Sequence, residues 1–333
     1  MKFGFATDCS RPVEEIAREM KYAEDLDFDY AWLADVGLNR DVYIALAACA
    51  TKTSSIQLGT SVTNPYTRHP AVAAAAFATI DEISNGRAVI GIGIGSRKNL
   101  LQPLGIIRKD TGPTCREAVE VMRGILGGRS SSFHGRFFGL RNARLEFKPN
   151  RKIPIYLAGR GRGTLAVAGE IADGVMFSSL ATPRAVKYAI NAIAEGAKSA
   201  GRDLSSVEKA LFVRVCMSKD GDKAKEAVRP FVPYRLWDDS HDTIRQLGYD
   251  EERVRKIKNA YGEGDLSKAG SLITDQMLED FALAGTVNDC VEKIEKLRTF
   301  GVTQIIVLPV PIESTEKNLL LKQFSEQIAA RFK

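Results

Sequence analysis

Two aspartates stand directly after short apolar segments, where a carboxylate can take part in proton transfer. Asp35 follows the run Tyr30-Ala-Trp-Leu-Ala34, and Asp8 follows the run from Lys2 to Thr7. A carboxylate at the end of a buried strand can orient a ring N–H group or act as a general acid or base. Asp is also frequent at helix N-caps and in solvated loops, so each residue has a structural alternative. We predict Asp35 as the main candidate catalytic residue and Asp8 as the second.

Two glycine-rich segments also follow apolar runs. Ala158-Gly-Arg-Gly-Arg-Gly163 precedes a helical pattern, where glycine allows close approach of a ligand and a helix N-terminus attracts anions. Arg160 and Arg162 add positive charge that could attract an anionic ligand, although a flexible surface turn is the alternative. Gly91-Ile-Gly-Ile-Gly95 indicates close packing beside a flat ligand or, equally, a tight turn at the end of a strand. Neither segment has the Gly-x-Gly-x-x-Gly spacing of a dinucleotide site.

Histidine and cysteine do not point to metal chemistry. The three histidines and the five cysteines are dispersed, without the spacing of a metal site, so no metal is expected. An odd number of cysteines without a Cys-x-x-Cys pair suggests reduced thiols. His69 precedes Pro70 at the start of a helical pattern, so we expect a capping or surface residue there rather than a catalytic base.

The elements that must position these residues alternate between strand and helix along the chain. Strands are predicted at Lys2–Thr7, Tyr30–Ala34, Ile56–Val62, Ala88–Ile92, Ile153–Ala158, Gly174–Ser178, Leu211–Met217 and Gln304–Leu308. Helical patterns separate them, and a closing helix runs to the C-terminus. Eight strands alternating with helices predict an α/β fold with a parallel sheet, and the number favours a closed (β/α)8 TIM barrel over an open sheet.

Two segments interrupt this alternation. Ser130 to Lys148 carries phenylalanines around Gly135 and Gly139, which predicts a strand hairpin inserted after the fourth helix. Asp222 to about Leu283 is highly charged and mostly helical in pattern, which predicts a helical insertion before the eighth helix. No short repeat or low-complexity linker divides the chain. We therefore expect residues 1–333 to form a single TIM-barrel domain.

Composition narrows the class of partner. The chain of 333 residues is 44% hydrophobic and 26% charged, as in an ordinary soluble protein. Its net charge of +6 is mild and no basic block is interleaved with aromatics, which favours a small anionic ligand over nucleic acid. No apolar stretch approaches the roughly 20 residues of a membrane span, and no signal peptide begins the chain. We expect a cytoplasmic protein with a small-molecule substrate and no nucleic-acid or membrane partner.

Several longer motifs carry a family resemblance. They are Asn64-Pro-Tyr-Thr-Arg68, Asp81-Glu-Ile-Ser-Asn-Gly-Arg-Ala-Val-Ile-Gly-Ile-Gly93, Ile171-Ala-Asp-Gly-Val175 and Gly301-Val-Thr-Gln-Ile305. With them the chain resembles the bacterial luciferase-like superfamily over nearly its whole length. Within that superfamily it is most similar to the coenzyme F420-dependent methylenetetrahydromethanopterin reductases.

The resemblance implies a deazaflavin cofactor, coenzyme F420, whose ring lies over the third strand at the carboxyl end of the barrel. It also implies a non-prolyl cis peptide at Ser61-Val62 and a homo-oligomer. Carried over by position, the residues lining the cofactor are Asp35, Ser61, Val62, Asn64, Gly93, Ile94, Gly95, Ala158 and Gly159. The implied reaction is hydride transfer between coenzyme F420 and an organic substrate, with methylenetetrahydromethanopterin as the candidate substrate.

Three positions depart from the reductase pattern. The resemblance implies a glutamate where this chain has Ala6, a histidine where it has Val36, and an acidic residue where it has Ser96. Asp8 lies two residues after Ala6, on the same face of the strand, and could supply the missing carboxylate. Two other functions stay open: an FMN-dependent monooxygenase of the same superfamily, and a non-catalytic member that binds the cofactor without turnover.

Overall fold

The strands of the protein close into a parallel barrel. The computed structural model describes residues 1–108, 110–312 and 317–333. In order around the barrel, the strands are β1 (Lys2–Asp8), β2 (Tyr30–Ala34), β3 (Gln57–Thr60), β4 (Ala88–Ile92), β7 (Ile155–Ala158), β8 (Gly174–Ser178), β9 (Glu208–Met217) and β11 (Gln304–Pro309). Pairing of β8 with β9 and of β11 with β1 completes the ring. The predicted (β/α)8 barrel is confirmed.

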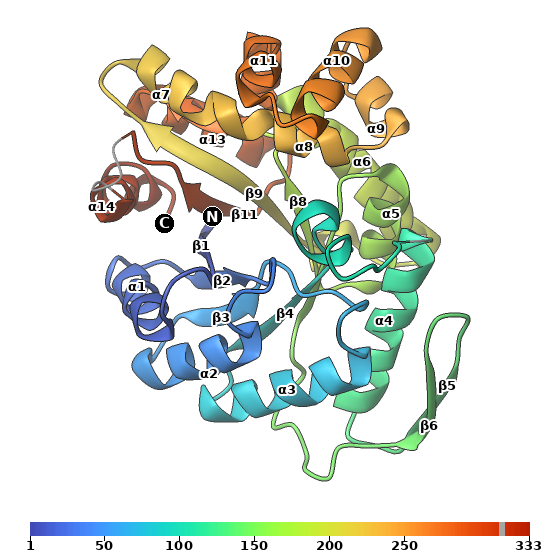
Figure 1. Ribbon diagram of the computed structural model, residues 1–333. Coiled ribbons are helices and arrows are strands. Elements are labelled where there is room, and N and C mark those ends of the chain that lie inside the picture. The colour runs from blue at the N-terminus through green and yellow to red at the C-terminus, as the bar shows by residue number, and fades with distance from the viewer. Residues whose placement is uncertain (109, 313–316) are drawn as a thin grey trace.

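Helices surround this barrel (Figure 1). They are α1 (Val13–Asp25), α2 (Val42–Lys52), α3 (Pro70–Ile83), α4 (Thr111–Leu126), α5 (Arg162–Ile171), α6 (Pro183–Ser199), α13 (Val287–Thr299) and α14 (Lys317–Gln327). The chain ends meet, because the amino group of Met1 donates to the carbonyl of Phe332 at 2.9 Å. The apolar segments that alternate along the sequence form the strands of the barrel and the helices that cover it.

The barrel interior is filled by side chains rather than open. One layer consists of the buried residues Ala6, Trp32, Val89, Tyr156, Met176, Ala210 and Ile306. The rings of Trp32 and Tyr156 meet edge to face, with their centroids 5.4 Å apart. Gly59 is required beside them, since a Cβ atom there would lie 2.5 Å from the Trp32 ring. Val62, Ala158, Phe212 and Leu308 pack against this cluster. A ligand that binds to the barrel strands is consequently expected at the end of the barrel rather than in its interior.

The predicted hairpin is present between α4 and β7. It pairs β5 (Ser131–His134) with β6 (Gly139–Ala143) in antiparallel fashion, and Figure 1 shows it extending alongside α4. Glu117 of α4 holds the turn, because its carboxylate accepts the backbone N–H groups of Arg136, Phe137 and Phe138 at 2.8–3.1 Å. Glu117 thus ties the turn of the insertion to α4, and an ion pair between Arg136 and Asp110 and the ring contact of Phe138 with His69 add to this attachment.

The predicted helical insertion is also present, with one correction. It contains α7 (Gly221–Val228), α8 (Val232–Asp238), α9 (His241–Gln246), α10 (Glu251–Gly262), α11 (Leu266–Ser271) and α12 (Asp275–Phe281). The helical prediction was wrong at Ala282 and Leu283, which begin β10 (Ala282–Gly285). This short strand forms because β9 is long enough for its last residues to pair with β10 after leaving β8.

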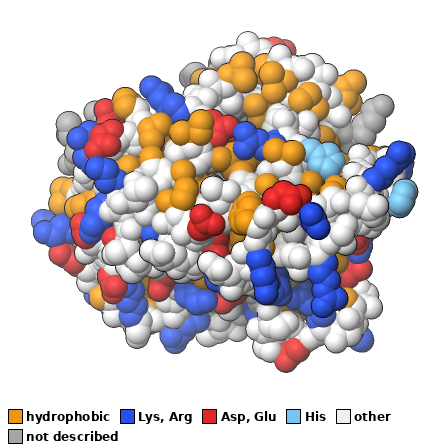
Figure 2. All heavy atoms as spheres, turned by 90° about the horizontal axis from the view of Figure 1, so that it is seen from below, with side chains coloured by type: hydrophobic (Ala, Val, Ile, Leu, Met, Phe, Trp, Pro, Cys, Tyr) orange, Lys and Arg blue, Asp and Glu red, His pale blue; other side chains and the backbone are white. Residues whose placement is uncertain are grey.

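The molecular surface mixes side chains of both charges. On the face shown in Figure 2, basic and acidic side chains lie interspersed with apolar ones. Among the helices of the described residues, none has the length and apolar character that crossing a membrane requires.

Candidate functional site at the carboxyl ends of the strands

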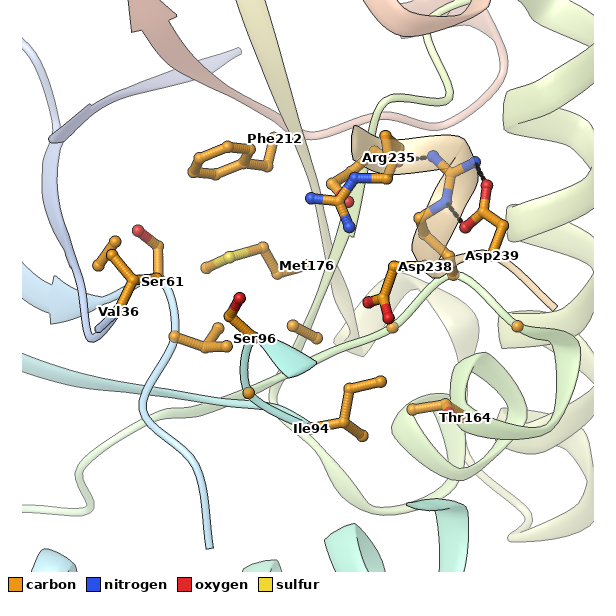
Figure 3. A pocket seen from close by; sticks show the side chains of 18 of the residues that line it. Val36, Ser61, Ile94, Ser96, Thr164, Met176, Phe212, Arg235, Asp238 and Asp239 are labelled. Carbon is orange, nitrogen blue, oxygen red and sulfur yellow. Dashed lines mark hydrogen bonds and ion pairs between the residues drawn. The ribbon is translucent and has the colours of Figure 1, made fainter. Parts of the chain in front are cut away.

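A cavity of about 1140 Å³ opens at the carboxyl ends of the barrel strands. Segments following β1, β2, β3, β4 and β7 contribute to its wall, together with residues within β8 and β9 and the last residues of β11. The helical insertion adds residues between Tyr234 and Thr243, and the starts of α4 and α14 add others. Figure 3 shows side chains from these separate elements facing one space. This is the end of a (β/α)8 barrel at which active sites are built.

Most of the predicted site residues meet in this cavity. Asp8, Asp35, Ser61, Val62, Ile94, Gly95, Ala158 and Gly159 line it. Asn64 and Gly93 do not lie in its wall. Asn64 is buried and its side-chain oxygen accepts the backbone N–H groups of Tyr66 and Thr67, each at 3.0 Å. Asn64 therefore shapes the turn behind the cavity.

The exit of β3 forms one side of the cavity. The Ser61-Val62 peptide is cis, as the resemblance implied. The Ser61 hydroxyl is buried and has no hydrogen-bond partner among the described residues. Gly93 packs directly behind, since a Cβ atom there would lie 2.9 Å from Cγ2 of Val62. An unsatisfied hydroxyl at a cavity wall is a polar group that a bound ligand can satisfy.

Asp35 is held in place by a chain of hydroxyl groups. Thr63 donates its hydroxyl to the Asp35 carboxylate at 3.0 Å, and the Tyr43 hydroxyl lies 2.8 Å from Thr63. Because the Thr63 proton is directed to Asp35, the Tyr43 hydroxyl must donate to Thr63. Burial raises the pKa of Asp35, opposed by the Thr63 hydrogen bond, and burial raises the pKa of Tyr43 to about 12. Asp35 thus presents a half-buried, oriented carboxyl group to the cavity.

Asp8 occupies a more open position at the cavity rim. Its carboxylate accepts the backbone N–H of Ser10 at 2.9 Å and also the Ser10 hydroxyl. Ala6, two residues earlier, is buried in the barrel interior and is absent from the cavity wall. Asp8 therefore combines a local turn with exposure to the cavity, whereas Asp35 has its own supporting network.

Both arginines of the glycine-rich segment pair with carboxylates. Arg160 is buried and its guanidinium forms a two-pronged pair with Asp239, at 2.8 and 2.7 Å, besides donating to two backbone carbonyls. Arg162 pairs with Glu195 at 2.7 Å. The Arg160 pair is buried, whereas the Arg162 pair is half-exposed. The segment still lines the cavity, and α5 begins at Arg162 without a side-chain cap.

Residues of β9 and of the insertion also line the cavity, although they were not among the predicted site residues. Phe212 and Arg214 lie on β9, and Tyr234 and Arg235 lie on α8. Figure 3 shows Arg235 beside Phe212, on the far side of the cavity from Ser61. Ser96 also faces the cavity and lies 3.0 Å from the Tyr234 hydroxyl. A charged residue inside the apolar run Leu211-Phe-Val-Arg-Val215 was the available signal for Arg214, since buried charge is rare without a reason.

His69 has the structural role that was expected. It caps α3, because its Nδ1 accepts the backbone N–H of Ala71 at 3.2 Å. Within the described part of the chain, no group of three or more histidine, cysteine, aspartate or glutamate side chains is arranged to hold a metal ion.

The cavity suits a flavin-type cofactor on physical grounds. Its volume accommodates a tricyclic ring with a tail, and its floor is apolar where Val62, Ala158 and Phe212 pack over the barrel interior. The unsatisfied Ser61 hydroxyl and the buried Asp35 carboxyl stand at its edge for the polar side of such a ring. The uncapped N-terminus of α5 offers N–H groups to an anionic tail.

Comparison with known proteins agrees with this geometry. The family model described as luciferase-like monooxygenase matches residues 2–304. The 5,10-methylenetetrahydromethanopterin reductase of Methanolobus tindarius is 36% identical over 92% of this chain and 93% of its own. The enzyme of the same name from Archaeoglobus fulgidus is 36% identical, with 92% of each chain covered.

A solved structure extends the likeness to three dimensions. The coenzyme F420-dependent tetrahydromethanopterin reductase of Methanopyrus kandleri superimposes with a TM-score of 0.89 and 32% identity, over 100% of this chain and 99% of that one. The family model, the sequence relatives and the fold agree, and the chain therefore belongs to the bacterial luciferase-like family.

Proposed function

We propose that this protein is an oxidoreductase that transfers a hydride between coenzyme F420 and an organic substrate. The tetrahydromethanopterin reductase of Methanopyrus kandleri is named as coenzyme F420-dependent, and its structure matches this chain over its whole length. The observation that carries the proposal is that seven of the nine candidate ring-binding residues, all except Asn64 and Gly93, come from four separate strand ends and line a single cavity. Such convergence is how (β/α)8 enzymes assemble a site.

The residues of this chain divide the work by position. When bound, coenzyme F420 supplies the hydride chemistry, and the protein supplies orientation and electrostatics. Val62 and Ala158 support the ring from the barrel side, and Ser61 offers a hydroxyl to its polar edge. Asp35, oriented by Thr63 and Tyr43, holds or moves a proton at its carboxyl group next to the reacting atoms. Apolar Phe212 and Met176 limit access of water to the same space.

Methylenetetrahydromethanopterin is the substrate that the named relatives suggest. Ala6, Val36 and Ser96 are apolar or neutral where the reductase pattern implies ionisable residues, so a different organic substrate is the alternative. Asp8 lies in the cavity wall, where it can supply the carboxylate absent at Ala6. We propose Asp35 as the principal proton-transfer residue and Asp8 as the second.

Matched fluorescence titrations with coenzyme F420 and with FMN test the proposal. We expect tighter binding of coenzyme F420 to the apo protein, followed by reduction or oxidation of the bound cofactor with a substrate. Equal or tighter binding of FMN would favour the monooxygenase alternative. Tight binding of coenzyme F420 without turnover of a broad set of acceptors and donors would favour the second alternative, a non-catalytic protein that binds the cofactor.

A further inference from the structure

Arg214 and Arg235 differ from the other arginines of the cavity wall. Arg11, Arg108, Arg160 and Arg162 each pair with a carboxylate, on Glu19, Asp238, Asp239 and Glu195 respectively. Among the described residues, Arg214 and Arg235 have neither an ion pair nor a hydrogen bond, and the Nε atom of each is buried without a partner. Two cations are thus placed side by side in a cavity wall without a counter-charge from the described chain.

The fold directs Arg214 into the cavity. Ala210, Phe212 and Arg214 alternate along β9 and share one face of the strand. Ala210 belongs to the buried interior layer and Phe212 packs against that layer, so Arg214 stands one step further out, at the cavity mouth. Its guanidinium lies over the Phe231 ring, 4.5 Å from the centroid. The stem is therefore fixed and the charged end is available to a ligand.

Electrostatics make this arrangement costly for the protein alone. Burial lowers the pKa of Arg214, and the nearby positive charge of Arg235 lowers it further, to about 10. Like charges held together out of water destabilise a fold unless an opposite charge joins them. Arginine is well suited to this task, because its planar guanidinium binds carboxylate or phosphate through two parallel N–H donors.

We propose that Arg214 and Arg235 form a binding site for an oxyanion, either a phosphate or a carboxylate group, of the substrate. The proposal rests on the proposed function for the place of the cofactor. In the ring of eight strands β9 lies four positions from β3, which is the opposite side of the barrel. A ring resting over β3 would leave its other face toward Arg214 and Arg235, where the substrate binds. The substrate class is therefore an organic molecule that carries an anionic group.

The same chemistry could serve the anionic tail of the cofactor, so the experiment separates the two sources. Inorganic phosphate is the probe, titrated by calorimetry into the full chain in a buffer free of other oxyanions and at constant ionic strength. The titration is done on the apo protein and on the protein saturated with coenzyme F420. Arg214→Met and Arg235→Met are compared with wild type. Arg255→Met is the matched control, since Arg255 is exposed on α10 of the same insertion.

We expect wild type and the Arg255 variant to bind phosphate equally, with or without coenzyme F420. Arg214→Met and Arg235→Met should each weaken phosphate binding by about tenfold or more, as expected for loss of a charged hydrogen-bond donor. Arg214→Lys should bind phosphate more tightly than Arg214→Met but less tightly than wild type, because lysine keeps the positive charge and lacks the two parallel N–H donors of the guanidinium. The affinity for coenzyme F420 should stay within about twofold of wild type in these variants, since neither arginine contacts the cofactor in the proposed arrangement.

Two results would overturn the proposal. One is phosphate affinity unchanged in both methionine variants, which would give the arginines a packing role only. The other is displacement of phosphate by coenzyme F420 together with weaker binding of coenzyme F420 to the variants, which would assign the site to the cofactor tail. Because phosphate binding to the apo protein needs no turnover, failure of the proposed hydride-transfer function would be seen separately. If one methionine variant does not fold, the other carries the test.

Discussion

At the scale of single residues, the chemistry depends on how each carboxylate is held. Asp35 is half-buried, and its carboxylate accepts a hydrogen bond from the Thr63 hydroxyl. The Thr63 hydroxyl in turn accepts a hydrogen bond from the Tyr43 hydroxyl. Asp8 accepts only groups of Ser10 in its own turn. A carboxyl group with a raised pKa and a fixed orientation is better suited to proton transfer than one at an open rim.

We predict that Asp35→Asn lowers turnover by about 10²–10⁴-fold, the usual contribution of a positioned acid or base. The change keeps the shape of the side chain and removes its titratable group. Asp8→Asn should lower turnover less. The measurement is kcat at saturating cofactor and substrate, with circular dichroism to show that each variant is folded.

His69→Gln is the control for this comparison. It should change turnover little, because His69 caps α3 and does not line the cavity. Near-full turnover in Asp35→Asn, combined with strong loss in His69→Gln, would mean that the assignment of the site is wrong. A larger loss in Asp8→Asn than in Asp35→Asn would instead show that Asp8 has taken over the role absent at Ala6.

Sequence patterns located the residues that directly follow strands and missed those that reach the cavity from elsewhere. Asp35 and Ser61 could be predicted from the sequence, because the carboxyl ends of all strands in a parallel barrel face one side. Arg235 was not, because α8 lies in an insertion whose packing on the barrel depends on contacts distant in sequence, such as Tyr234 with Ser96. Arg160 was predicted as a ligand group because its partner Asp239 is 79 residues away.

At the scale of elements, the acidic side chain of Glu117 holds the turn of the β5–β6 hairpin. Burial raises the pKa of Glu117, but the backbone N–H groups of Phe137, Arg136 and Phe138 lower it, and the net pKa is below its usual value. A lowered pKa means that the folded state binds the proton less tightly than the unfolded state. Its stabilising effect is therefore complete above the ordinary glutamate pKa of about 4.3 and is lost as pH falls through the lowered value.

We predict that Glu117→Ala increases amide hydrogen exchange across residues 131–143 at neutral pH while activity is retained. The reason is that three backbone N–H groups lose their acceptor, whereas the cavity lies elsewhere. Glu120→Ala is the matched control, since Glu120 is exposed on the same helix. In wild type the protection should fall on acidification below about pH 4. Equal exchange in the two variants at neutral pH would contradict this role.

A second element-scale prediction concerns the motif that carried the family resemblance. Arg87 lies at the amino-terminal end of β4, away from the cavity, and is buried. Its guanidinium donates to the carbonyls of Ser84, Thr53, Ile56 and Ala50 at 2.7–3.0 Å. It thereby joins the end of α2 to the starts of β3 and β4. Much of this motif is therefore structural, as is usual for the end of a barrel opposite the site.

We predict that Arg87→Met lowers the free energy of unfolding by about 3 kcal/mol or more, because several buried carbonyls lose their donors. Urea denaturation measures the change, and kcat of the folded variant should remain near that of wild type. Arg331→Met provides a control for loss of one positive charge at an exposed position. A loss of kcat without a loss of stability would place Arg87 in the function of the site instead.

At the scale of the whole molecule, the closed barrel was predictable because each of its strands is a short apolar run between helical patterns. The ninth strand, β10, was not, because only its pairing with the far end of β9 makes Ala282–Gly285 extended. The position of the insertion over the cavity was equally hidden. It is fixed by long-range ion pairs, Arg160 with Asp239 and Arg108 with Asp238, rather than by local pattern.

The last prediction tests how the insertion is attached to the barrel. Arg160 and Asp239 have side chains that are only 7% and 5% exposed. Removal of one partner leaves a buried charge unpaired, which typically costs about 3–5 kcal/mol, whereas replacement of both by apolar groups costs much less. Asp239→Asn should therefore destabilise the protein strongly, as measured by urea denaturation.

The double variant Arg160→Met with Asp239→Leu should recover most of the lost stability. It should still weaken binding of coenzyme F420, because both residues line the cavity wall and set the distance between α5 and the insertion. Fluorescence titration of the double variant measures that effect apart from folding. If the single and double variants were equally destabilised, the pair would matter for packing alone. If the double variant bound coenzyme F420 as wild type does, the Arg160–Asp239 pair would not shape the cofactor site. The contribution of the insertion to the cavity would then be limited to binding of the substrate.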